Sequence, residues 1–177
     1  MIEKLHIGPG KCFLSGWINI DVFSFVTADV YSSALSLPYP PESFSLIYAS
    51  HITEHLNRHM TLSALGHWRS LLKPGGKLRL AVPSFEAICK RYGETGDINE
   101  VMGLLYGGQK FILDVHYSAF DKKSLTLMLE KVGFKEVHEW DWRDTEHSQF
   151  DDYSQAYLPH LNKDTGRLMS LNLEAIK

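Results

Sequence analysis

The stretch LHIGPGKCFLSGWINID, at residues 5–21, decides the fold of this chain. It overlaps two apolar runs of strand length, 4–7 and 17–22, and the first run stops at Gly8-Pro9-Gly10. Two glycines let the backbone turn tightly and approach a ligand, but a dinucleotide fingerprint needs a third glycine where this chain has Phe13. Alone, the turn is as typical of an ordinary loop as of a ligand site.

Asp21 ends the second apolar run. A carboxylate at a strand end can accept hydrogen bonds from both hydroxyls of a ribose, which favours a nucleoside cofactor over a solvated turn. Only residues 8–16 connect the two strands, whereas a parallel crossover usually needs about 10–12 residues or more. The first crossover helix is therefore expected to be very short or absent.

Strands that alternate with helices predict a mostly parallel α/β sheet, with ligands beyond the carboxyl ends of its strands. Ser84 and Asp121 are candidate helix N-caps, and Gly133 is a candidate helix stop. The turn 73–76 is expected to separate a helix from a strand. The further expected strands are 28–31, 46–50, 77–83, 134–142 and 168–177, and the expected helices are 58–72, 84–92, 98–106 and 121–132.

Length and charge restrict the function. The 177 residues favour one domain over 1–177, and the net charge of -3 weighs against nucleic acid as the main partner. Two cysteines are too few for a disulfide framework and favour a reducing compartment. Neither a signal peptide nor an apolar run of about 18–20 residues is present, so a cytoplasmic protein without a membrane partner is expected.

The sequence His51-Ile52-Thr53-Glu54-His55 matches the HxxEH pattern of one class of zinc peptidases. Two histidines at i and i+4 on one helix could bind zinc, with the glutamate as base. However, the motif directly follows the strand 46–50, so its histidines need not share a helix face. A third ligand in a matching downstream helix is not apparent. We therefore expect no metal site.

Two further regions have a structural and a functional interpretation. His116 precedes the helix 121–132 in a loop that should lie near the carboxyl end of the sheet. It is either a structural histidine or a general base, since its pKa lies near neutrality. The polar region 143–167 is interpreted as a surface loop, with a lid over the active site as the alternative.

Segments along nearly the whole chain resemble the class I S-adenosylmethionine-dependent methyltransferases, most of all a short bacterial group. The combination of GWINID, YASHxxEHL and LKPGG is specific. The segments that carry the resemblance are LHIGPG (5–10), GWINID (16–21), LPYPPESFSLIYASHITEHL (37–56), LLKPGGKLRLAVPS (71–84), YGGQ (106–109), GF (133–134) and SLNLEAIK (170–177). The resemblance implies a Rossmann-like, doubly wound sheet of seven strands, six parallel and the last antiparallel.

The resemblance also implies how S-adenosylmethionine is held. Glycines of the first turn would pass beneath its methionine part, Asp21 would bind the ribose, and the segment after the third strand would flank the adenine. The implied cofactor-binding residues are Ile7, Gly8, Pro9, Gly10, Asp21, Ser33, Ala34, Ser50 and His51.

This chain departs from the family pattern at His6, Cys12, Ser33 and Ser45, where an acidic residue, a glycine and two aspartates are common. The serine at position 33 cannot accept a hydrogen bond from the adenine amino group as a carboxylate would. Weaker cofactor affinity is therefore expected.

The implied activity is methyl transfer to a small-molecule acceptor, expected to be a hydroxyl or a similar nucleophile. The methyl group is already activated by the sulfonium, so the in-line alignment of nucleophile, methyl carbon and sulfur is expected to contribute most to the rate. For a hydroxyl acceptor, His116 is the first candidate base and His51 the second. The segments 84–120 and 143–167 are expected to shape the acceptor pocket.

Three other classes stay open: a non-catalytic S-adenosylmethionine-binding partner or regulator, a zinc hydrolase, and a nucleic-acid methyltransferase. The acidic charge weighs against the last, as does YASH where a flipped-base enzyme has a motif of the Asn-Pro-Pro-Tyr type. A homodimer is compatible with the sequence.

Overall fold

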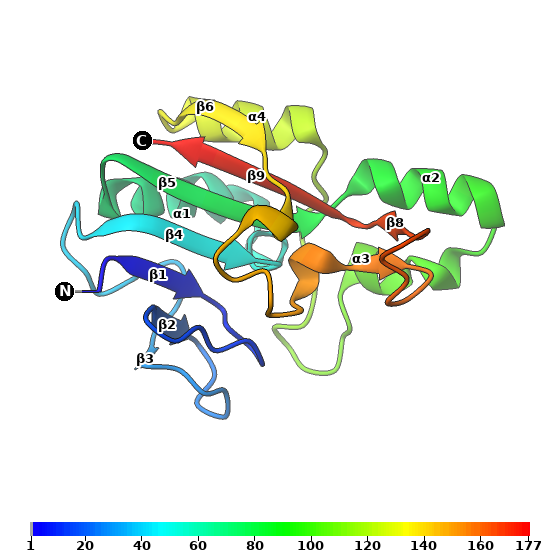
Figure 1. Cartoon of the computed structure of the whole chain (residues 1–177), viewed down its shortest axis with the longest axis horizontal. Coiled ribbons are helices and arrows are strands. Elements are labelled where there is room, and N and C mark those ends of the chain that lie inside the picture. The colour runs from blue at the N-terminus through cyan, green and yellow to red at the C-terminus, as the bar shows by residue number, and fades with distance from the viewer. Residues whose placement is uncertain (1) are drawn as a thin grey trace.

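Seven strands form the central sheet, in the order β3-β2-β1-β4-β5-β9-β6 (Figure 1). The computed structural model describes residues 2–177. Six strands are parallel, and β9 is antiparallel to its neighbours β5 and β6, as expected. The strands are β1 (Lys4–Ile7), β2 (Ile18–Asp21), β3 (Val30–Tyr31), β4 (Phe44–Ser50), β5 (Leu72–Pro83), β6 (Lys135–Glu139) and β9 (Ser170–Ile176).

Two helices cover one face of this sheet. Helices α1 (Arg58–Leu71) and α4 (Lys122–Lys131) bury apolar residues against alternate residues of the strands, such as Ile47 and Ala49 of β4. The local signals for these helices are confirmed: Asp121 caps α4 in a capping box, and Gly133 follows its end with a φ of 97°. This face holds the main hydrophobic core.

The opposite face is covered by residues 140–158, which we call the covering segment. In the described chain, the connections 8–17 and 22–29 contain no helix, which confirms the expectation for the first crossover. Instead, Trp140 and Phe150 of the covering segment pack on a second core made by Leu14, Trp17, Leu46 and Tyr48. The covering segment contains short 3-10 turns and no α-helix, so α1 and α4 lie together on the other face of the sheet.

The remaining elements lie beyond the carboxyl ends of the parallel strands (Figure 1). Helix α2 (Phe85–Thr95), capped by Ser84, packs with α3 (Met102–Tyr106) and the two-stranded sheet of β7 and β8. The short elements here and near the site are η1 (Thr53–His55), η2 (Ile98–Glu100), η3 (Trp142–Asp144), η4 (Tyr153–Gln155), β7 (Tyr157–Leu158) and β8 (Arg167–Leu168). None of the helices between residues 2 and 177 combines the length and the hydropathy that crossing a bilayer requires.

Three expected elements differ from the structure. The turn at 73–76 belongs to β5, because Leu72 pairs with Phe44 and the Gly76 carbonyl accepts a hydrogen bond from Lys177. The expected helix 98–106 is divided into η2 and α3, and the expected strand 28–31 is reduced to Val30–Tyr31. For the two strand regions, pairing with neighbouring strands decided what local propensity left open.

The interpretation of 143–167 as a surface loop is also wrong for part of its length. Thr145, His147, Ser154 and Gln155 are buried. The His147 ring stacks on Tyr48 with centroids 4.3 Å apart, and Gln155 donates hydrogen bonds to two carbonyls within the segment. Polar side chains therefore help to fill this layer, and the side chains of Thr145, His147 and Gln155 each have a hydrogen-bond partner there.

His6 lies beneath the covering segment at a position where the resemblance suggests an acidic residue. Its ring stacks on Tyr48 with centroids 5.1 Å apart, and its Nδ1 lies 3.2 Å from Asn19 Oδ1. Burial lowers the pKa of His6 to about 4. The ring is thus held neutral in the folded protein.

The lowered pKa of His6 makes the stability depend on pH. Between pH 7 and pH 5 the unfolded chain gains a proton that the folded chain does not, so stability falls as pH falls. The variant His6→Phe keeps the stacked ring but cannot take up this proton. We expect it to reduce the difference in the free energy of unfolding between pH 7 and pH 5, measured with urea, by about 2 kcal/mol. The exposed His59, changed to Phe, is the matched control and should leave the loss unchanged. An identical pH dependence in His6→Phe and wild type would contradict the assignment.

Candidate functional site

The turn after β1 brings backbone, without side chains, to the carboxyl edge of the sheet. Gly8 and Gly10 have φ values of 70° and 52°, which favour glycine. A Cβ on Gly8 would lie 2.0 Å from Ile52 Cδ1, whereas a Cβ on Gly10 would meet nothing within 4 Å. Gly8 is therefore needed for packing, and Gly10 borders open space that a ligand can enter.

Asp21 lies beside this turn, at the end of the adjacent strand β2. Its Oδ1 accepts a hydrogen bond from Phe23 N at 2.9 Å, and its Oδ2 lies 3.5 Å from Gly10 N. A carboxylate oxygen has two lone-pair directions, so each oxygen can accept one more hydrogen. The buried carboxylate therefore fits a ligand with two neighbouring hydroxyls, such as a ribose.

The segment after β3 lies next along the same edge, because Ser32 N donates to Asp21 O at 2.9 Å. The Ala34 carbonyl accepts a hydrogen bond from Trp68 of α1 at 2.7 Å, which anchors the segment. Ser33 is exposed, and its Oγ accepts from Leu35 N at 3.2 Å. The predicted adenine contacts thus border the same edge as Asp21.

His51 and Ser50 lie at the end of β4, and both are buried. His51 adopts a φ of 53°, which is uncommon for a residue other than glycine. Its Nε2 lies 3.2 Å from Ser170 Oγ, and its Nδ1 lies 3.2 Å from Glu54 Oε1. The backbone turn directs the His51 ring toward Glu54.

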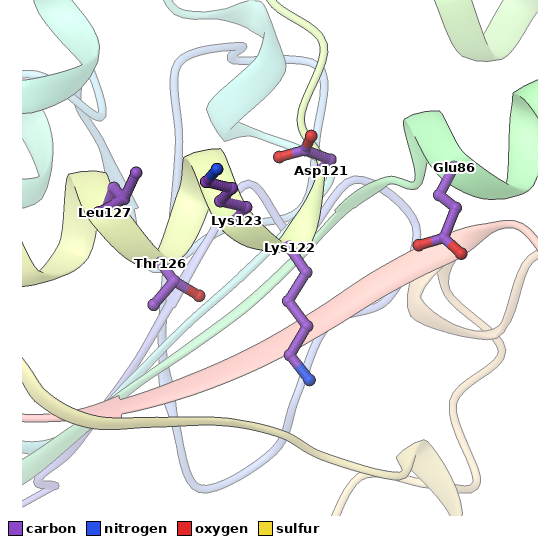
Figure 2. A pocket seen from close by; sticks show the side chains of 6 residues that line it. All are labelled: Glu86, Asp121, Lys122, Lys123, Thr126 and Leu127. Atoms are coloured by element: carbon purple, nitrogen blue, oxygen red, sulfur yellow. The ribbon is translucent and has the colours of Figure 1, made fainter.

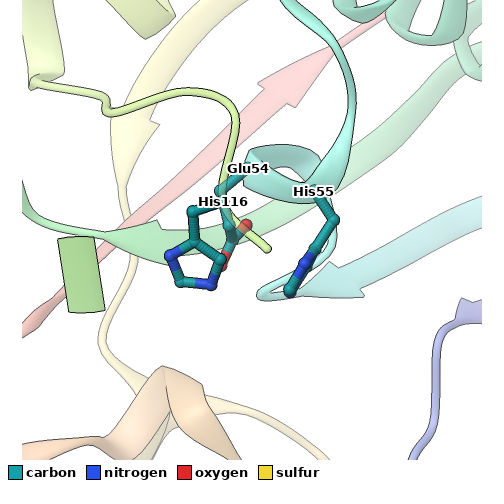
Figure 3. Close-up of side chains that lie close together, drawn as sticks. All are labelled: Glu54, His55 and His116. Carbon is teal, nitrogen blue, oxygen red and sulfur yellow. The ribbon is translucent and has the colours of Figure 1, made fainter. Parts of the chain in front are cut away.

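Glu54, on η1, lies near both predicted catalytic histidines, His51 and His116. Figure 3 shows its carboxylate between the rings of His55 and His116. It is 0% exposed, and neither carboxylate oxygen has a hydrogen-bond partner among residues 2–177. Burial raises the pKa of the Glu54 carboxyl, but His51 and then His55 outweigh this effect and hold that pKa below its ordinary value. The site thus contains a buried negative charge.

The loop that carries His116 closes over Glu54. Tyr117 N donates to the Glu54 carbonyl at 2.8 Å, and His116 Nε2 lies 4.0 Å from Glu54 Oε1. Burial lowers the pKa of His116, although Glu54 opposes this effect. The structure therefore brings together His51 and His116, which are far apart in the sequence.

Glu54 and His55 were noted in the sequence only as parts of the HxxEH pattern. The structure shows that the two histidines of that pattern do not act as an i, i+4 pair on a helix, because η1 is a single short turn. His55 instead faces His116, with ring centroids 4.6 Å apart. No sequence spacing could have identified this third partner, because His116 comes from a loop.

Aromatic side chains border the site. Phe23, next to Asp21 in sequence, stacks on Phe25 and meets Phe111 edge-on, with centroids 4.9 and 5.1 Å apart. Phe25 is 74% exposed. From the covering segment, Tyr153 lies 5.2 Å from the His51 ring. Both segments that were expected to shape an acceptor pocket thus contribute an aromatic ring to this edge.

A shallow hollow elsewhere on the surface does not belong to this site. It lies between the start of α2 and α4 (Figure 2) and contains none of the predicted site residues. Its lining is mostly charged and comprises Glu86, Asp121, Lys122, Lys123, Thr126 and Leu127.

Comparisons with known proteins identify the family and the fold. A family model described as a methyltransferase domain matches residues 7–139. No curated protein sequence matches the chain significantly.

Similar solved structures include a SAM-dependent methyltransferase from Thermotoga maritima, described as a possible histamine N-methyltransferase. It has a TM-score of 0.61 and 16% identity, with 99% of this chain and 82% of that chain covered. A SAM-dependent methyltransferase from Archaeoglobus fulgidus has a TM-score of 0.61 and 17% identity, with 98% of this chain and 85% of that chain covered. One from Mesorhizobium loti has a TM-score of 0.58 and 16% identity, with 99% of this chain and 90% of that chain covered. At these identities the likeness shows the fold.

The two glycines of the first turn predict different responses to substitution. Gly8→Ala adds a Cβ at positive φ and forces Ile52 to move, whereas Gly10→Ala meets only the backbone preference. We expect Gly10→Ala to lose about 1–2 kcal/mol of stability in urea unfolding and Gly8→Ala to lose more. Adding Ile52→Val to Gly8→Ala should recover part of the difference. Equal losses in both single variants, with no recovery, would contradict the contact.

Proposed function

This chain belongs to the methyltransferase-domain family, and from that premise we propose that it transfers a methyl group from S-adenosylmethionine to a hydroxyl of a small-molecule acceptor. One observation carries the proposal. The open turn at Gly10, after β1, and the carboxylate of Asp21, at the end of β2, lie together at the carboxyl edge, and β1 also pairs with β4, the strand that directly precedes His51. This is where an open α/β sheet binds its ligand.

In this proposal the chain holds the cofactor along three strand ends. Ile7, Gly8, Pro9 and Gly10 lie beneath the methionine part, with Ser50 and His51 at its end. Asp21 accepts hydrogen bonds from the ribose hydroxyls, and Ser33 and Ala34 flank the adenine. When bound, S-adenosylmethionine supplies a methyl group that is already activated as a sulfonium.

His116 is the proposed base for the acceptor hydroxyl. Its Nδ1 lies 2.9 Å from the Leu104 carbonyl, which can only accept, so Nδ1 carries the hydrogen and Nε2 presents a free lone pair. Glu54, 4.0 Å away, stabilises the imidazolium that forms when Nε2 takes the proton. His51 is the second candidate, but both of its ring nitrogens already face protein groups.

The proposed acceptor is a small molecule rather than a nucleic acid or a membrane lipid. The net charge of -3 would oppose a phosphate backbone. The rings of Tyr153 and Phe111 border the site from the two segments expected to shape the pocket, and aromatic walls exclude water. We further propose that residues 1–177 act as one catalytic domain in the cytoplasm, as a monomer or a homodimer.

Cofactor binding should depend on Asp21. We expect calorimetry to show binding of S-adenosylhomocysteine, and Asp21→Ala to weaken it by about 1.5–3 kcal/mol, because hydrogen bonds to a charged group are lost. Asp164→Ala, which removes an exposed carboxylate in a distant part of the sequence, is the control. No binding at millimolar ligand, or equal binding of nicotinamide dinucleotides, would refute the assignment.

Catalysis should depend on His116. The measurement first requires an acceptor, which is identified by screening a metabolite panel with labelled cofactor. His116→Ala should lower kcat by about 10²–10⁴ and leave cofactor affinity within about twofold, because a positioned base is lost. The exposed His59, changed to Ala, should retain full activity. An unchanged kcat in His116→Ala would remove this residue from the mechanism, and a parallel loss of cofactor binding would place it in the cofactor site instead.

A further inference from the structure

The buried Glu54 carboxylate has no group that compensates its charge by hydrogen bonding. Its side chain is 0% exposed, and across the described chain neither oxygen has a hydrogen-bond partner. His51 Nδ1, at 3.2 Å, lacks hydrogen-bond geometry to Oε1. Burying a carboxylate without hydrogen bonds costs several kcal/mol, so a cation beside it stabilises the site, and His51 supplies one only when it is protonated.

Two imidazole lone pairs are directed at the same place. His55 Nδ1 lies 3.1 Å from the Val115 carbonyl, and His116 Nδ1 lies 2.9 Å from the Leu104 carbonyl. A carbonyl can only accept, so both Nδ1 atoms carry hydrogen and both Nε2 atoms are left with free lone pairs. Metal-binding histidines are commonly held this way, with the second ring nitrogen donating to a backbone carbonyl.

The three side chains surround one point. A carboxylate oxygen of Glu54 and one nitrogen each of His55 and His116 all lie within 4.8 Å of one another, and the two rings flank the carboxylate (Figure 3). Ligand atoms bound at about 2.1 Å to a tetrahedral ion lie about 3.4 Å apart. The three atoms must therefore close by about an ångström to share an ion, a movement within the reach of side-chain rotation.

We propose that Glu54, His55 and His116 bind a divalent first-row transition-metal ion. One carboxylate and two imidazoles suit Zn²⁺ and Mn²⁺, and three protein ligands leave room for a further oxygen. His116 Nε2 has one lone pair, so it binds the ion in the metal-bound protein and serves as the proposed base only in the metal-free protein.

This inference departs from the expectation of no metal site. That expectation assumed that His51 and His55 would be the paired ligands and that a third ligand would come from a downstream helix. In the structure the His51 ring is held by Ser170 and faces Glu54, and His116 reaches the site from a loop.

Calorimetric titration of the chelator-treated protein with MnCl₂ or ZnCl₂, without cofactor or acceptor, tests the site. We expect one ion to bind per chain. Glu54→Gln and His116→Ala should each weaken metal binding at least about tenfold. Loss of a group that is hydrogen-bonded to a metal ligand already lowers metal affinity by that factor, and loss of the ligand itself should lower it at least as much. His59→Ala, an exposed histidine outside the cluster, is the control and should bind as wild type does. Far-UV circular dichroism checks that the variants fold, which Glu54→Gln should do readily because it removes a buried charge.

The absence of binding to wild type, or binding that both cluster variants retain, would overturn the proposal. Binding of S-adenosylhomocysteine in the presence of chelator separates the two proposals. If that binding persists while no metal binds, the metal site fails and the methyltransferase proposal stands. If the metal binds and the cofactor does not, the metal site stands and the proposed function fails.

Discussion

A parallel sheet must be covered on both faces, and this chain covers only one of them with helices. The connections 8–17 and 22–29 are too short to form the crossover helices that would cover the other. Residues 140–158 do so instead. Arg79 of β5 anchors that segment, because its guanidinium lies 3.0 Å from Glu146 and 2.9 Å from Glu174 of β9. The position of Tyr153 beside His51 follows from this substitution of a covering segment for helices.

Much of the fold could be predicted from sequence because its signals are local. Ser84 accepts from Ala87 N and Asp121 accepts from Ser124 N, as helix N-caps do. Asp21 ends a strand whose apolar residues precede it. The strand character of 73–76 could not be predicted in this way, because it depends on pairing with Phe44 and Lys177, which lie elsewhere in the chain.

The candidate site shows the same division. The turn at Gly8 and Gly10 and the carboxylate of Asp21 are readable because they follow strands directly. The burial of His147 is not, because it depends on stacking with Tyr48 of β4, which is far away in the sequence. The cluster at Glu54 is not either, because it forms only when the loop after α3 returns to donate from Tyr117 N to the Glu54 carbonyl.

The place of β9 in the sheet also bears on the order in which the protein can fold during synthesis. This strand is the last of the seven in the chain, yet it lies between β5 and β6 and pairs with both. A ribosome releases the chain from its N-terminus, so β6 leaves it before β9, the strand with which it pairs. The parallel strands up to β5 can assemble earlier, whereas the edge of β5 stays open until β9 arrives. Translation of the final strand is therefore the step that closes the sheet.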